Sequence, residues 1–145
     1  MSITHDDITA AARIAPRVRE TPLWRLPGSA LGLPGGTPAC QVWLKLERLQ
    51  LLGSFKARCM FNRLPSNPIP PAGVIAASGG NAGIATAVAV LALGVRAEIY
   101  VPSAISHAKR ERLAALGATV VIAGDAYADA LLACEACVIS ARPAR

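Results

Sequence analysis

The chain has 145 residues, of which 53% are hydrophobic and 17% are charged, and its formal net charge is +6. This hydrophobic share excludes a disordered chain, and the scattered positive residues form no basic run with aromatics, which argues against a nucleic-acid-binding surface. Residues 72–95 are uncharged, but the polar turn at 78–81 divides them into pieces too short to cross a membrane. We therefore predict a folded protein that binds neither nucleic acid nor membrane.

The first part of the chain predicts a helix, a loop and a strand. Apolar residues recur at helical spacing over 6–19, where Pro16 must bend or interrupt the helix. The Thr-Pro-Leu sequence at 21–23 predicts an extended connection, and residues 27–39, rich in Pro and Gly, predict a loop. Side chains alternate between apolar and polar over 42–47, which predicts a strand.

A helix and a proline-rich linker follow this strand. Residues 55–64 predict a helix with Ser54 as its N-cap. The linker, residues 65–71, contains four prolines, and proline interrupts both helices and sheets. We therefore place a domain boundary there, which divides the chain into residues 1–66 and 67–145.

The rest of the chain alternates short apolar strands with helices. This order predicts an α/β fold, a parallel doubly wound sheet with flanking helices. Gly94 and Gly117 stand where a left-handed residue ends a helix, and Asp125 is the predicted cap of the last helix. The tail, 140–145, is expected to fray. The predicted strands are 74–77, 97–101 and 119–123, and the predicted helices are 81–93, 105–116 and 126–137.

The cysteines predict thiols in a reducing compartment. Residues 1–7 are polar and lack the apolar segment of a secretory leader, so we expect a cytoplasmic protein. Cys134 and Cys137 have CxxC spacing, but no second pair and no nearby His completes a zinc site, and we predict no bound metal. The remaining two cysteines are Cys40 and Cys59.

Lys56 is the first candidate for chemistry. It follows a Gly-Ser-Phe sequence at the start of a predicted helix, where the positive end of the helix dipole lies. Nearby positive charge and partial burial both favour the neutral form of a lysine amine, which attacks an aldehyde to form a Schiff base. The structural alternative is an exposed lysine in the first turn of a helix.

The second candidate is the Ser-Gly-Gly-Asn-Ala-Gly sequence at 78–83, between a predicted strand and a predicted helix. Glycines let the backbone approach a ligand closely, and the N–H groups at a helix start bind anions. In an open α/β sheet such a turn lies at the carboxyl end of a strand, where ligands bind. The structural alternative is a tight turn with Asn81 as a helix cap.

Both segments resemble motifs of the fold-type-II pyridoxal-phosphate (PLP) enzymes. Residues 47–58 resemble the lysine motif of that family, and residues 78–83 resemble its asparagine loop. Pro102 and Lys109 also match positions of the family, and the similarity covers residues 6–135. Within the family, the chain is most similar to the threonine and serine dehydratases.

The resemblance implies a role for each candidate residue. Lys56 would attach PLP through a Schiff base and later move the substrate α-proton, Phe55 would pack against the cofactor ring, and Asn81 would hydrogen-bond the 3′-oxygen of PLP. The implied reaction is β-elimination of the hydroxyl of L-threonine or L-serine, which gives a 2-oxo acid and ammonia, with the cofactor as the electron sink. The carboxylate of this small amino-acid substrate would be held by Ser78, Gly79, Gly80, Asn81 and Ala82.

Two departures from the family pattern matter. Related serine racemases carry a serine where this chain has Gly79, which weakens the alternative of racemisation. Family chains are longer, and no glycine-rich phosphate-binding run follows Gly124. The resemblance therefore implies that residues 1–66 are the N-terminal part of the large PLP domain and 67–145 the small domain. We expect a truncated chain with little activity alone, either a homo-oligomer or a chain that lacks its C-terminal half.

Two further functions stay open from the sequence. One is a lyase for another β-substituted amino acid. The other belongs to a different class, a non-catalytic α/β interaction or regulatory domain, which explains the strand-helix alternation but not the turn that precedes Lys56.

Overall fold

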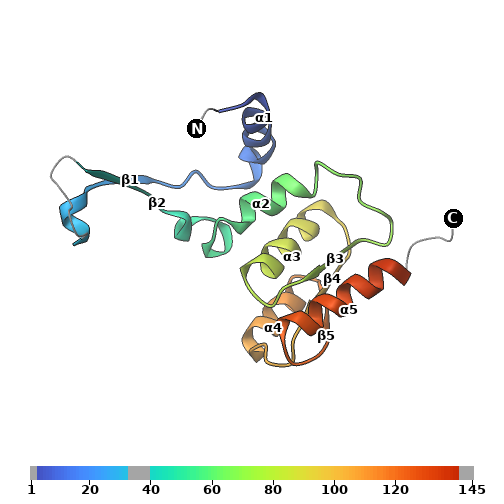
Figure 1. Ribbon diagram of the computed structural model, residues 1–145. Helices are drawn as coiled ribbons and strands as arrows, with labels where there is room; N and C mark the ends of the chain where they lie inside the picture. Colours follow the sequence, from blue (N-terminus) through green and yellow to red (C-terminus); the bar gives the residue numbers. More distant parts are fainter. Residues whose placement is uncertain (1–2, 33–39, 141–145) are drawn as a thin grey trace.

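The computed structural model describes residues 3–32 and 40–140. Figure 1 shows a protruding N-terminal part and an α/β unit formed by the second half of the chain. In chain order the elements are α1 (His5–Ile14), η1 (Ala15–Arg17), β1 (Leu23–Pro27), η2 (Gly28–Leu31), β2 (Gln41–Lys45), η3 (Glu47–Leu49), η4 (Leu51–Gly53), α2 (Lys56–Arg63), β3 (Val74–Ala77), α3 (Asn81–Leu93), β4 (Ala97–Val101), α4 (His107–Ala115), β5 (Thr119–Ile122) and α5 (Tyr127–Ser140), where η marks a 3₁₀ turn.

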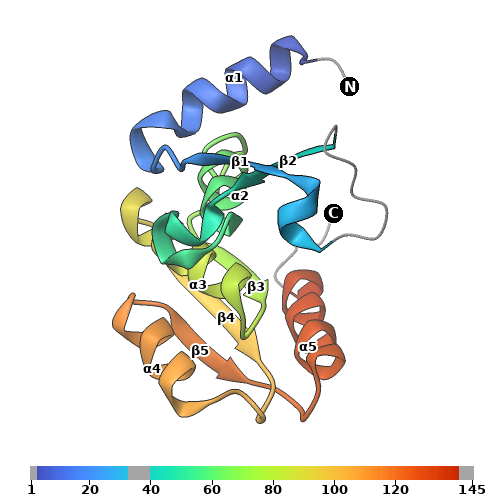
Figure 2. The same ribbon diagram turned by 90° about the vertical axis from the view of Figure 1, so that its left-hand side faces the viewer.

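The α/β unit is built on a parallel sheet with the strand order β3-β4-β5. In its register Ala76 pairs with Ile99, and Ile99 pairs with Val120. Helices α3 and α4 cover one face of this sheet and α5 covers the other (Figure 2). The predicted fold class, a parallel sheet with flanking helices, is therefore confirmed.

Strand β4 supplies both apolar layers of the core. Ile99 and Val101 are fully buried and pack with Leu113 on one side of the sheet. Tyr100, which lies between them in sequence, packs with Ala130 on the side of α5. Successive side chains of a strand point to opposite faces, so this central strand is apolar on both.

Helix α2 joins the N-terminal part to this core. Ala57 and Phe61 are buried in one apolar cluster with Ile84 and Val90 of α3. The cluster therefore includes residues on both sides of the proline-rich linker, and the proposed division at residue 66 stays a prediction.

Strands β1 and β2 form an antiparallel hairpin that extends away from the rest of the molecule (Figure 1). Trp24 and Trp43 are each 55% exposed, and the Arg25 guanidinium lies 5.6 Å from the centroid of the Trp43 ring. The hairpin thus presents aromatic surface that no other described part of the chain covers.

The structure corrects several predicted boundaries. Pro16 does interrupt the first helix: α1 ends at Ile14 and a 3₁₀ turn follows. Strand β1 was not predicted, and the loop expected over 27–39 begins with the 3₁₀ turn η2. Residues 33–39 and the tail 141–145 lie outside the described residues.

The start of α5 also differs from the prediction. The N–H groups of Asp125 and Ala126 donate to Oδ2 of Asp129, at 3.0 and 2.9 Å. The carboxylate of Asp125 instead accepts a hydrogen bond from the Ser103 hydroxyl, at 2.6 Å. The helix start is therefore capped from inside the first turn rather than by Asp125.

Among the described residues, we find no helix that is both long enough and apolar enough to cross a membrane.

Candidate active site

Lys56 is the first residue of α2, and the turn before it has a strained backbone. Leu52 and Gly53 both adopt left-handed backbone conformations, with φ of 67° and 73°. For a residue with a side chain this conformation costs about 1–2 kcal/mol. The N-cap of α2 is Phe55, which makes no side-chain capping hydrogen bond. The predicted cap, Ser54, lies one residue earlier, and its hydroxyl accepts a hydrogen bond from the Lys56 N–H at 3.3 Å.

The side chain of Lys56 lies beside a half-exposed aromatic ring. Lys56 is half-buried, and its Nζ is 4.7 Å from the centroid of the Phe55 ring. The Phe55 side chain is 51% exposed. The amine therefore stands next to an open apolar face, against which a flat ring can pack.

A polar cluster surrounds the other side of this turn. Arg58 grips the Glu47 carboxylate with two hydrogen bonds, Nε to Oε2 at 2.9 Å and Nη2 to Oε1 at 3.0 Å. The Thr21 hydroxyl donates to Oε1 of Glu47 at 2.6 Å. The hydrogen bond from Arg58 is the main reason why the pKa of Glu47 lies below its ordinary value. A two-pronged charged contact of this kind fixes geometry as well as charge.

Gln50 extends the cluster to the chain segment that precedes the hairpin. It is only 2% exposed. Its Oε1 accepts from the N–H groups of Arg19 and Leu51, at 2.8 and 2.9 Å, and its Nε2 donates to the Arg19 carbonyl at 2.7 Å. Arg58 Nη2 donates to the same carbonyl at 3.0 Å. We call Arg19, Thr21, Glu47, Gln50 and Arg58 the clamp.

The asparagine loop lies where the sequence predicts, between the carboxyl end of β3 and the start of α3. The Ser78 N–H donates to the Tyr100 carbonyl at 3.0 Å, and the Ser78 hydroxyl accepts from the Gly80 N–H at 3.3 Å. A Cβ at Gly83 would stand 2.0 Å from the Ser78 carbonyl oxygen. Only glycine permits this close crossing of helix and strand end.

The loop presents hydrogen-bond donors. Asn81 is exposed, while Ser78, Gly79, Gly80 and Ala82 are half-buried. Within the described residues, the N–H groups of Asn81, Ala82 and Gly83 have no hydrogen-bond partner. These are the unsatisfied donors of a helix start, and they form a site suited to an anion such as a carboxylate.

The two candidate segments belong to adjacent helices. Helix α2 packs against α3, and η4, immediately before the Lys56 turn, also contacts α3. Both helices begin at the same side of the packed pair (Figure 1). The fold thus places the lysine and the asparagine loop at neighbouring helix starts.

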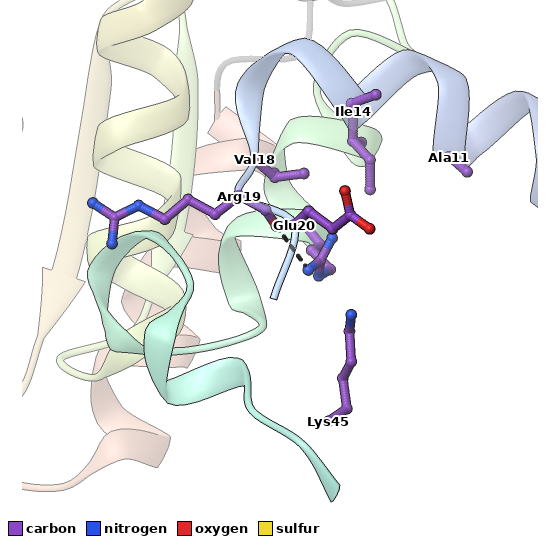
Figure 3. A pocket seen from close by; sticks show the side chains of 8 residues that line it. Ala11, Ile14, Val18, Arg19, Glu20 and Lys45 are labelled. Carbon is purple, nitrogen blue, oxygen red and sulfur yellow. Dashed lines mark hydrogen bonds between the residues drawn. The ribbon is translucent and has the colours of Figure 1, made fainter. Parts of the chain in front are cut away.

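A hollow of about 310 Å³ lies next to the clamp but does not include Lys56 or the asparagine loop (Figure 3). Ile14 and Val18 face it from α1 and the segment that follows, and Lys45 points toward it from the end of β2. The Lys45 Nζ donates to the Thr21 carbonyl at 2.5 Å. The full lining is Ala11, Ile14, Ala15, Val18, Arg19, Glu20, Lys45 and Arg58.

Cys134 and Cys137 lie behind the sheet rather than at either candidate segment. Burial raises the pKa of Cys134. A hydrogen bond with Cys137 is the main reason why the pKa of Tyr100 is raised to about 12, and burial of Tyr100 is the second reason. No group of three His, Cys, Asp or Glu side chains that could hold a metal ion occurs in the described part of the chain.

Comparison with known proteins identifies the family. Residues 14–143 match the family described as pyridoxal-phosphate dependent enzymes. The chain belongs to this family. This PLP-family chain is 33% identical over 128 residues to the catabolic L-threonine dehydratase of Staphylococcus aureus (strain USA300), a match that covers 87% of the chain and 36% of that protein. It is 38% identical over 116 residues to the biosynthetic chloroplastic threonine dehydratase 1 of Solanum lycopersicum, which covers 77% of the chain and 18% of that protein.

Solved structures agree with this assignment. A PLP-dependent aspartate racemase superposes with a TM-score of 0.73 at 32% identity, over 97% of this chain and 44% of the racemase. A threonine deaminase from T.th. gives a TM-score of 0.73 at 32% identity, over 92% of this chain and 41% of that enzyme. The predicted resemblance to fold-type-II PLP enzymes is confirmed. The chain spans about a third of the Staphylococcus relative, and a smaller share of the plant one.

The sequence predicts roles for Lys56 and the asparagine loop, which stay predictions, but it does not predict the clamp. Glu47 and Arg58 were recognised only as parts of a motif, and Thr21 only as part of an extended connection. One signal was present: Gln50 is a polar residue inside the apolar run 49–52. A buried polar side chain in such a run is held by hydrogen bonds, and it marks a place where the backbone needs support.

Proposed function

We propose that this chain forms the lysine-bearing part of an enzyme that eliminates the β-hydroxyl from L-threonine or L-serine, giving a 2-oxo acid and ammonia. The observation that carries the proposal is the pair of neighbouring helix starts, one with Lys56 and the other with the free N–H groups of residues 81–83. The similarity to threonine dehydratases supports the choice of substrate.

The described residues offer groups that suit three parts of PLP. Lys56 offers the amine for the aldehyde, and Phe55, with its exposed ring beside that amine, offers a surface for the pyridine ring. Asn81, exposed at the start of α3, is the proposed partner of the 3′-oxygen. When bound, PLP supplies the electron sink that stabilises negative charge at the substrate α-carbon.

The protein's own groups would bind the substrate and move its proton. The Ser78 hydroxyl and the N–H groups of Gly79 and Ala82 would hold the substrate carboxylate, aided by the positive end of the α3 dipole. The Gly80 N–H, which donates to the Ser78 hydroxyl at 3.3 Å, would share its hydrogen with that carboxylate. Asn81 would contribute its own N–H. The Lys56 amine would take the α-proton, since the same turn that positions it for the cofactor brings it to the face of the substrate.

Gly79 supports elimination over racemisation. Racemisation needs a second proton donor on the opposite face of the α-carbon, and a glycine provides none. A Cβ at Gly79 would lie 3.2 Å from Cδ1 of Ile105, so a side chain there would need Ile105 to shift by a few tenths of an ångström. We therefore propose that D-isomer formation is a minor outcome.

The proposal extends to the setting of the enzyme. We propose a cytoplasmic protein that acts on a small amino acid and assembles either with copies of itself or with a further part of the same enzyme. A polypeptide of these 145 residues alone is expected to have little turnover, because no glycine-rich run that could hold the cofactor phosphate follows Gly124 in its sequence. Each charge-assisted hydrogen bond lost from a phosphate costs roughly 1.5–3 kcal/mol.

Substrate turnover tests the proposal. The native enzyme, saturated with PLP, should release ammonia and a 2-oxo acid from L-threonine or L-serine, and chiral chromatography should show little D-serine. Lys56→Ala should abolish this release, whereas Lys109→Ala, a change at an exposed lysine of α4, should leave it unchanged. D-serine accumulating faster than pyruvate, or full activity in Lys56→Ala, would overturn the assignment.

A further inference from the structure

The clamp connects the two ends of the Lys56 turn to one external segment. Gln50 lies six positions before Lys56 and Arg58 two positions after it, and both donate to the carbonyl of Arg19, at 2.7 and 3.0 Å. Arg19 lies more than thirty residues away in sequence. The segment at Arg19 therefore holds the turn at both of its ends, although it is distant from both in sequence.

This turn needs such support because its backbone is strained. Leu52 holds a left-handed conformation between the two anchors. A strained conformation of this kind persists only when the surrounding structure over-determines it. Gln50, Arg58 and Glu47 constrain the turn through hydrogen bonds of 2.6 to 3.2 Å. Most of these hydrogen bonds involve a charged side chain or a buried one.

The clamp is aimed away from Lys56 itself. Residues two apart in a helix do not face each other, so the Arg58 side chain leaves α2 on a different side from that of Lys56. The clamp can therefore hold the backbone without blocking the amine.

We propose that the clamp is a positioning device: it fixes the turn so that the Lys56 amine is presented to the cofactor aldehyde in a reactive orientation. This inference rests on the proposed role of Lys56. In it, Arg58 acts through its two-pronged geometry rather than its charge alone, because a lysine cannot bridge both Glu47 oxygens and the Arg19 carbonyl at once.

The test compares PLP capture in the native enzyme, Arg58→Lys and Thr21→Val. Arg58→Lys keeps the charge and removes the fork, while Thr21→Val keeps the shape and removes one hydroxyl. Glu111→Gln is the matched control, because it neutralises a carboxylate whose partner, His107, lies at 3.3 Å on the exposed face of α4. For each protein, the thermal unfolding midpoint and the PLP dissociation constant from absorbance titration are measured, the latter where the protein is fully folded.

The proposal predicts that folded Arg58→Lys binds PLP at Lys56 about tenfold or more weakly, a change in affinity of the size expected when one charge-assisted hydrogen bond that holds the turn is lost. Thr21→Val should show a smaller loss in the same direction, and Glu111→Gln none. If folded Arg58→Lys binds PLP as tightly as the native enzyme and differs only in a lower thermal unfolding midpoint, the clamp is a purely structural feature and the proposal fails. If Arg58→Lys does not fold, Thr21→Val decides by the same comparison.

The two proposals fail separately. If borohydride traps no PLP on Lys56 in the unaltered enzyme, the proposed function fails, whatever the variants do. If Lys56 is trapped in the unaltered enzyme and the folded clamp variants bind PLP as tightly, only the positioning role fails.

Discussion

Replacing Gly83 by alanine separates the structure's prediction from that of the sequence alone. Gly83 lies in the first turn of α3, and an alanine inside a helix is favoured over glycine by about 1 kcal/mol. Sequence reasoning alone therefore expects Gly83→Ala to stabilise the protein. The structure predicts the reverse, because the new methyl group would stand 2.0 Å from the Ser78 carbonyl oxygen and 3.3 Å from Cγ2 of Ile99.

The size of the effect follows from this geometry. Real Cβ contacts are essentially never shorter than 3.0 Å, so α3 and the end of β3 must separate by about 1 Å. The clashing partner is backbone, which cannot rotate away as a side chain can. Overpacking of this kind costs about 1–3 kcal/mol, and the upper end applies here. After the gain in helix propensity, we expect a net loss of about 2 kcal/mol in the free energy of unfolding.

Urea denaturation of the native protein, Gly83→Ala and Gly80→Ala measures this loss. Gly80→Ala is the matched control, since it lies three residues earlier in the same loop and its new Cβ would meet no atom closer than 4.0 Å. We expect Gly80→Ala to stay within about 0.5 kcal/mol of the parent, as substitutions without a clash do. A Gly83→Ala protein as stable as the parent would refute the close crossing of α3 and β3.

Three other predictions concern charge, thiols and capping. Because Arg58 lowers the pKa of Glu47 in the folded state, this contact stabilises the fold at pH values above 4.5, the ordinary pKa of glutamate. The stabilisation is lost as the pH falls through the lowered pKa. The free energy of unfolding should therefore drop below about pH 4.5, and it should drop less steeply in Arg58→Gln. Iodoacetamide should modify exposed Cys59 well before buried Cys134, whose pKa burial raises, and peptide mass mapping would show the opposite order if the packing of α5 were wrong. Asp129→Ala should lower the free energy of unfolding by about 1 kcal/mol in a urea titration, because two N–H groups at the start of α5 lose their acceptor; no change would remove its capping role.

Much of the α/β unit could be predicted from the sequence because local signals coincide there. Strands 74–77 and 97–101 and helix 81–93 match the observed β3, β4 and α3 at both ends. Each strand is a short apolar run, and Gly94, with φ of 67°, ends the helix where a left-handed residue was expected. Neighbouring signals were sufficient because each element begins and ends on its own residues.

The N-terminal part could be predicted less well because contacts distant in sequence determine it. Strand β1 begins directly after Pro22 and ends at Pro27, and its apolar alternation is broken, so only pairing with β2 makes it a strand. The clamp has the same origin: the hydrogen bond from Arg58 to the Arg19 carbonyl spans 39 residues. No periodic pattern in the sequence marks such partners. The roles of Lys56 and of the asparagine loop stay predictions because they depend on a bound cofactor.

The central claim, that Lys56 is the residue that binds PLP covalently, has a direct test. The native enzyme is incubated with PLP and reduced with borohydride, and its peptides are mapped by mass spectrometry. We predict a phosphopyridoxyl group on Lys56, with Lys45 and Lys109 unmodified. A label on Lys45 or Lys109 with Lys56 unmodified would contradict the account.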